Sequence, residues 1–196
     1  MKSPMKVKDA EVAYKTTHKK YTYQDYLAMP EDGNRYEIIN GELIIALTPL
    51  IIHQQISINI SYQLYKFLED HSLGEFLKAP CDVVLSDFNV FQPDIFFIAN
   101  ENREILTEKN ISGAPDVVWE IISIDTAYND LIEKKELYAE FGVKEYWLVD
   151  PKKQWVEIFE NRDGKFESVQ KLEKEGIAKS TIISGWEIDL SKIFKA

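Results

Sequence analysis

The sequence predicts a mixed α/β fold in which a central sheet is flanked by helices. Residues 117–123 are a near-continuous run of apolar β-formers, which is typical of a strand covered on both faces. Residues 49–73 repeat an apolar side chain every four positions, which predicts a long helix. Further strand patterns and a second helix alternate along the chain, and this order is that of an α/β domain.

Capping and turn residues place the first elements. Thr22 followed by Asp25 predicts the start of a short helix that ends at Pro30. Asn40-Gly41 predicts a β-hairpin, because this dipeptide accepts the positive φ angles of a type I′ turn. The strands of this hairpin are expected at residues 35–39 and 42–47.

The long helix is expected to begin at Thr48 and Pro49 and to end at Gly74. Its repeating apolar positions are Ile52, Ile56, Ile60, Leu64 and Leu68. The remaining strand patterns cover residues 76–85, 93–98, 145–149, 155–160 and 165–169, and further helices are predicted at 127–141 and 190–194.

The length of 196 residues predicts one domain over residues 21–196, preceded by a lysine-rich flexible arm over residues 1–20. The arm lacks the apolar segment of a signal peptide, and no apolar run approaches the ~20 residues of a membrane span. The single cysteine, Cys81, excludes a disulfide within the chain and a multi-cysteine zinc site. We therefore expect a cytoplasmic protein without membrane contact.

The net charge of -10 excludes a protein that binds DNA through a broad basic surface. Any contact with nucleic acid has to be local, or has to use metal ions held by carboxylates.

Two carboxylates occur in apolar strand patterns. Glu120 lies inside the run 117–122, and Asp94 stands at the start of the strand pattern 93–98. A carboxylate in a buried strand costs several kcal/mol unless a proton, a partner or a metal compensates it. Each has an ordinary explanation too: a solvent-exposed strand end for Glu120, and a strand-entry turn for Asp94. If both converge on adjacent strands, they form an oxygen-ligand site for a hard cation such as Mg²⁺.

A lysine in the following helix is directed at the sheet. On a helical wheel, Lys134 lies within roughly 20° of the centre of the apolar face, whereas Lys135 lies to its side. A lysine on such a face extends to solvent or finds an anion. Lys134 is therefore expected to extend to solvent, to pair with Asp130, or to direct its ammonium group at the two carboxylates.

Two further residues are weaker candidates. Glu37 shares a strand face with Ile39, and either an exposed strand face or a place at the site explains it. His53 lies in the first turn of the long helix and can approach the site, although a half-buried, hydrogen-bonded histidine is the better interpretation.

These residues belong to an ordered set of motifs that resembles the putative restriction endonuclease family of the PD-(D/E)XK nuclease superfamily. The resemblance covers roughly residues 20 to 190. In chain order the motifs are RYEIINGEL (35–43), PD (93–94), VWEIIS (118–123), EK (133–134), LYA (137–139), GV (142–143), EYW (145–147) and VDP (149–151).

The resemblance implies a restriction-endonuclease-like core and metal-dependent cleavage of DNA phosphodiester bonds. It implies that Asp94 and Glu120 are the two acidic residues of the superfamily motif. The backbone carbonyl of Ile121 is then a further ligand of Mg²⁺, for which Mn²⁺ would substitute.

The chain departs from the family pattern at two places. The superfamily usually has a lysine two residues after the second acid, where this chain has Ile122, and Lys134 fits the displaced position. Relatives commonly have Ser-Pro-Ser-Thr after the strand, whereas residues 123–126 are Ser-Ile-Asp-Thr, so Asp125 adds a negative charge near the site.

The leading interpretation is an endonuclease in which Asp94 and Glu120 hold the metal. Glu37 assists directly or through water, and Lys134 positions the attacking water. The phosphate-facing side would then require the basic residues Lys78, Lys134, Lys135, Lys144 and Arg162.

The alternative is a non-catalytic, homodimeric regulatory or interaction protein that retains the fold, and the acidic charge favours it. A homodimer is expected because C-terminal aromatic residues suggest an apolar surface: Trp147, Trp155, Phe159 and Trp186.

Overall fold

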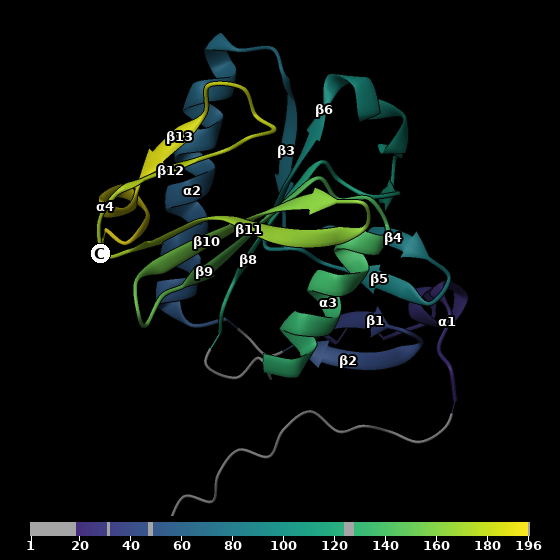
Figure 1. Ribbon diagram of the computed structural model, residues 1–196. Coiled ribbons are helices and arrows are strands. Elements are labelled where there is room, and N and C mark those ends of the chain that lie inside the picture. Colours follow the sequence, from purple (N-terminus) through teal and green to yellow (C-terminus); the bar gives the residue numbers. More distant parts are fainter. Residues whose placement is uncertain (1–18, 31, 47–48, 124–127, 196) are drawn as a thin grey trace, which may run out of the picture.

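The computed structural model describes residues 19–30, 32–46, 49–123 and 128–195 (Figure 1). Residues 1–18 of the predicted arm, as well as Thr48 and Asp125, lie outside these ranges. The elements are α1 (Tyr23–Leu27), β1 (Arg35–Ile39), β2 (Glu42–Ala46), α2 (Ile51–Asp70), β3 (Gly74–Lys78), β4 (Val83–Ser86), β5 (Asn89–Phe91), β6 (Ile95–Ala99) and the 3₁₀ helix η1 (Asn100–Ile105). They continue with β7 (Ile111–Ser112), β8 (Val117–Ile121), α3 (Tyr128–Glu140), β9 (Glu145–Asp150), β10 (Trp155–Arg162), β11 (Lys165–Glu173), β12 (Ile177–Lys179), β13 (Glu187–Asp189) and α4 (Leu190–Ile193).

The predicted α/β fold with mixed sheets and flanking helices is confirmed. A six-stranded sheet has the order β11-β10-β9-β8-β6-β3, in which β8 and β9 are parallel and the other neighbours antiparallel. A five-stranded sheet has the order β2-β1-β5-β4-β7. Figure 1 shows α2 along one side of the larger sheet and α3 between that sheet and the β1–β2 hairpin. None of the helices in the described ranges is long and apolar enough to cross a membrane.

Each face of the six-stranded sheet has its own apolar core. Alternate residues of β8, Val117, Trp119 and Ile121, pack with α2 and the C-terminal elements. Val118 packs on the opposite face with α3 and the smaller sheet. Because neighbouring side chains of a strand point to opposite faces, Glu120 is directed to the face covered by α3.

The predicted hairpin is confirmed, and it docks against α3. Ile39 and Glu42 are the last paired residues, and Asn40 and Gly41 between them have positive φ angles of 52° and 83°. The side-chain amide of Asn40 donates to Glu133 Oε1 at 2.7 Å. This contact brings β1 beside the helix that contains Lys134.

The prediction of one continuous strand over residues 76–85 is wrong. It divides into β3 and β4, which belong to different sheets, and Pro80 lies between them. Proline cannot donate a ladder hydrogen bond, so the chain leaves one sheet there and enters the other. The sequence did not predict β5 or the turn at residues 87–88 that joins it to β4.

The long helix begins at Ile51 with Leu50 as its N-cap, without a side-chain capping bond, and it ends at Asp70 rather than at Gly74. Gly74 instead begins β3, where the backbone of the neighbouring strand β6 passes so closely that a Cβ would collide with the Ile98 carbonyl. The glycine therefore serves close strand packing.

The aromatic surface predicted near the C-terminus is wrong. Trp147 and Trp186 are fully buried and Phe159 nearly so, while Trp155 is half-buried under Lys171. The sequence did not predict the short strands β12 and β13, whose residues Ala178 and Ile188 share a core with Trp147 and Trp186. The homodimer stays a prediction, without this surface to support it.

Glu145 fastens the C-terminal segment to the sheet. The fully buried carboxylate accepts hydrogen bonds from the indole N–H of Trp147, from the Ser180 hydroxyl, and from the backbone N–H and hydroxyl of Thr181. The Glu145 side chain is therefore the common acceptor for donors of three residues. Removing this side chain would leave those buried donors unpaired.

We predict that Glu145→Ala lowers the free energy of unfolding by at least about 3 kcal/mol, because several buried donors lose their acceptor. Urea denaturation measures this loss. The control Glu175→Ala, at an exposed position, should change stability by less than about 0.5 kcal/mol. Equal stability of the two variants would contradict the role of Glu145.

Candidate active site

The two predicted acids lie at the same end of adjacent strands. Asp94 directly precedes β6, and Glu120 is the penultimate residue of β8. The strands are antiparallel neighbours in which Ile95 pairs with Trp119. The expected placement of the two acids on adjacent strands is therefore confirmed.

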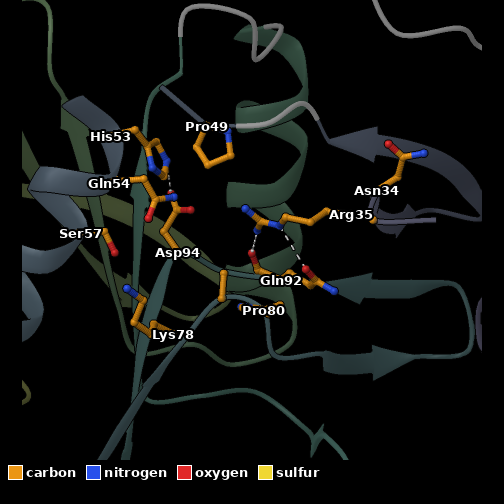
Figure 2. A pocket seen from close by; sticks show the side chains of 12 residues that line it. Asn34, Arg35, Pro49, His53, Gln54, Ser57, Lys78, Pro80, Gln92 and Asp94 are labelled. Carbon is orange, nitrogen blue, oxygen red and sulfur yellow. Dashed lines mark hydrogen bonds and ion pairs between the residues drawn. The ribbon is translucent and has the colours of Figure 1, made fainter. Parts of the chain in front are cut away.

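Asp94 is held on one oxygen by two donors. Its Oδ2 accepts the backbone N–H of Ile121 at 2.8 Å and contacts His53 Nε2 at 3.0 Å. Figure 2 shows the histidine ring directed at this carboxylate. Asp94 is 6 % exposed, so it is more than a polar residue in a strand-entry turn.

Glu120 is buried rather than exposed at a frayed strand end. Its Oε1 accepts the Tyr138 hydroxyl at 2.9 Å and lies 3.7 Å from Lys134 Nζ. Burial raises the pKa of Glu120 to about 7, although Lys134 opposes this shift, and the charges of Asp94 and Glu37 add to it. The carboxylate therefore lacks full compensation by the protein itself.

Lys134 forms its closest ion pair with Glu37. Its Nζ lies 2.6 Å from Glu37 Oε2 and 2.8 Å from Oε1, and both side chains are buried. Desolvation lowers the pKa of Lys134, but Glu120 and Glu37 outweigh it, so the pKa lies above its ordinary value. The exposed-face explanation of Glu37 is therefore wrong. The side chain of Asp130 lies outside the described part of the structure.

The helical wheel distinguished the two neighbouring lysines of α3 correctly. Lys134 faces the sheet and is 8 % exposed. Lys135 is half-buried and places its Nζ 3.2 Å from the centre of the Phe159 ring, away from the carboxylates.

Two residues that contact the carboxylates, Tyr138 and His53, were not among the leading site candidates from the sequence. Tyr138 lies one turn after Lys134 on the same face of α3, and in the sequence it stood out only as part of the LYA motif. His53 is buried and hydrogen-bonded, as expected, but its partner is Asp94 itself. The signal was available, because His53 precedes the buried positions Ile56 and Ile60 on the same face of α2.

The predicted phosphate-facing group does not assemble. Lys144 pairs with Asp116 at 2.6 Å, and Arg162 pairs with acidic neighbours on β10 and β11. Both lie at the opposite end of the sheet, since Lys144 immediately precedes Glu145, which pairs with the first residue of β8. Of the predicted group, Lys78 and Lys134 lie at the Asp94 end.

The free carboxylate oxygens test whether the site suits a cation. Within the described ranges, Asp94 Oδ1 and Glu120 Oε2 accept no hydrogen bond, while their partner oxygens are occupied. The N–H of Ile121 points to Asp94. Since the carbonyl of a strand residue points to the same side as its N–H, the Ile121 carbonyl is also directed toward the Asp94 side. The atoms that remain available to bind a cation are oxygens, which are the ligand atoms that hard divalent cations prefer.

The described residues contain no group of three or more His, Cys, Asp or Glu side chains that could hold a metal ion. A site here would therefore rely on two carboxylates completed by a carbonyl, water and substrate, a sparse ligand set of the kind that Mg²⁺ accepts.

Comparison with solved structures confirms the fold. The chain is similar to the crystal structure of a putative nuclease belonging to DUF820 from Anabaena variabilis ATCC 29413, with a TM-score of 0.75 and 18% sequence identity. The match covers 88% of this chain and 97% of that one. No curated protein matches the chain.

The family model for Uma2, described as putative restriction endonuclease, matches residues 23–191. The chain belongs to this family, and the resemblance seen in the sequence is thereby confirmed.

We predict that Lys134→Met lowers the free energy of unfolding by about 3–5 kcal/mol at neutral pH, because Glu37 is left as a buried, uncompensated charge. Chemical denaturation measures the loss. Lys135→Met is the matched control and should cost less than about 1 kcal/mol, since it removes only a partly exposed contact with Phe159.

The double variant Glu37→Gln/Lys134→Met should recover part of the loss, because it removes both members of the pair. Equal losses in the two single lysine variants would contradict the buried pair.

Proposed function

We propose that the protein is a metal-dependent endonuclease that hydrolyses phosphodiester bonds of DNA. The observation that supports this most strongly is the pair of buried carboxylates on adjacent strands, Asp94 and Glu120, with Lys134 beside them. Membership of a family described as putative restriction endonuclease also supports a nuclease function.

Asp94, Glu120 and the backbone carbonyl of Ile121 would hold Mg²⁺, with Mn²⁺ as a substitute. When bound, the cation would neutralise charge on the phosphodiester and activate a water molecule for attack. Its charge would also compensate the buried carboxylates, whose burial is otherwise costly.

The chain's own residues orient these groups. His53 and the Ile121 N–H fix Asp94 through Oδ2, and Tyr138 fixes Glu120 through Oε1, so each acid turns its other oxygen away from these donors. Glu37 accepts the Gln92 N–H at 2.8 Å and holds the Lys134 ammonium group. Lys134 is thereby kept next to Glu120, where it would position the attacking water.

We predict that the protein nicks supercoiled plasmid DNA in the presence of Mg²⁺ or Mn²⁺ and that EDTA abolishes nicking. Asp94→Asn and Glu120→Gln should each reduce the rate at least about 100-fold, the order of effect expected when a positioned electrostatic group is lost. Agarose gel electrophoresis measures the rate.

Asp87→Asn is the control, because this exposed aspartate lies in the β4–β5 turn. It should nick at the parent rate. Nicking that survives in Asp94→Asn would exclude the mechanism, and a complete absence of nicking in the parent would favour the non-catalytic alternative.

We predict that Mn²⁺ raises the melting temperature of the parent and that His53→Phe needs a 10- to 100-fold higher Mn²⁺ concentration for the same shift. The reason is that His53 orients the ligand Asp94, and such partners of ligands commonly have effects of this size. Differential scanning fluorimetry over a Mn²⁺ series measures the shift.

The control is His71→Phe, at an exposed histidine that stacks on Phe67. It should follow the parent. If Mn²⁺ stabilises the parent and both histidine variants alike, His53 has no part in holding the site.

A further inference from the structure

A pocket of about 410 Å³ opens directly beside Asp94 (Figure 2). It is lined by the residues at the start of β1, by the first turns of α2 and by the segment that joins β3 to β4. The polar residues that matter here are Asn34, Arg35, His53, Lys78, Gln92 and Asp94. Asp94 therefore belongs both to the carboxylate site and to the wall of this pocket.

The two basic side chains of this pocket lack an acidic partner among the residues that the structure describes. Arg35 and Lys78 form no ion pair with a carboxylate of the described residues, although the chain has ten more acidic than basic side chains. Two other basic residues expected at the phosphate-facing side, Lys144 and Arg162, are by contrast paired with carboxylates. Two cations without a carboxylate partner in the described ranges, placed beside a carboxylate site, favour an anionic ligand.

Arg35 is oriented by a neutral residue before any ligand arrives. Its Nε donates to Gln92 Oε1 at 3.1 Å, and its Nη2 donates to the Gln92 carbonyl at 2.7 Å. The Gln92 amide in turn donates to Asp82 and to Tyr26, which fix its orientation. Figure 2 shows the guanidinium group extending from β1 toward Asp94.

The planar guanidinium group keeps its other N–H donors for a ligand. Such a fork matches the oxygens of a phosphate group, and little side-chain entropy remains to be lost on binding. The wall also contains a buried polar atom, Nδ1 of His53, that has no hydrogen-bond partner among the described residues. His53 is 6 % exposed. An unpaired buried atom of this kind indicates that a polar group completes the pocket.

We propose that this pocket binds a phosphate group of the DNA strand that is being cleaved, next to the phosphate at Asp94 and Glu120. Arg35 is the main contact, through its guanidinium fork, and Lys78 adds a point charge at the rim. This inference rests on the proposed function and adds to it the place where the acidic chain contacts the DNA backbone.

The test is DNA binding without cleavage. A fluorescein-labelled DNA duplex is titrated with protein in EDTA over a series of salt concentrations, and fluorescence anisotropy gives Kd. Arg35→Gln should weaken binding about 10-fold and reduce the slope of log Kd against log salt by about 1, because one phosphate contact is lost. Arg162→Gln, which alters an arginine at the far end of the sheet, should match the parent.

Lys78→Gln covers the case that Arg35→Gln disturbs the fold, because Lys78 is exposed. It should reduce the slope in the same direction, with a smaller change in Kd. Replacing single phosphates of the duplex by uncharged methylphosphonate should weaken the parent at one position, and the same replacement should not weaken Arg35→Gln further.

If the parent binds and nicks DNA but Arg35→Gln and Lys78→Gln both behave like Arg162→Gln, this inference alone is overturned. If the parent neither binds nor nicks DNA, the proposed function fails and the inference fails with it.

Discussion

The contact on which the rest of the site depends is the buried ion pair between Lys134 and Glu37. Burying charged groups is costly, and here two carboxylates, those of Glu37 and Glu120, share one ammonium group at the end of a sheet. The pair joins the β1–β2 hairpin to α3, and Lys134 reaches Glu120 on β8 from the same position. The smaller sheet, the helix and the larger sheet therefore meet at one cluster of charges, which remains incompletely compensated at Glu120.

The fold separates this chemistry from the groups that provide most of the stability. The apolar cores cover both faces of the six-stranded sheet, whereas the carboxylates lie where β6 begins and β8 ends. At the opposite end, Asp116 and Glu145 are equally buried, but Lys144 and a set of hydrogen-bond donors satisfy them. The two ends thus contain similar residues with different degrees of compensation, and the less compensated end is the one beside the pocket.

The sequence predicted the parts of the site that follow from one element alone. Glu120 stood out as an acid in an apolar strand, and the wheel of α3 selected Lys134 over Lys135. The sequence could not show that Glu37 is buried, because this depends on α3 packing against the hairpin. The contact of His53 with Asp94 depends on where α2 docks, and the division of residues 76–85 depends on two sheets competing for one segment. Likewise, the burial of Trp147 and Trp186 depends on a core that includes residues of β12 and β13, which the sequence did not predict.

The central claim is that Asp94 and Glu120 hold one divalent cation. Anomalous diffraction from crystals soaked in Mn²⁺ tests it most directly, because the signal locates the metal independently of activity. We expect one strong peak between the two carboxylates, within roughly 2.0–2.6 Å of an oxygen atom of each, and its loss in crystals of Glu120→Gln. A peak elsewhere, or no peak between these carboxylates at saturating Mn²⁺, would contradict the claim.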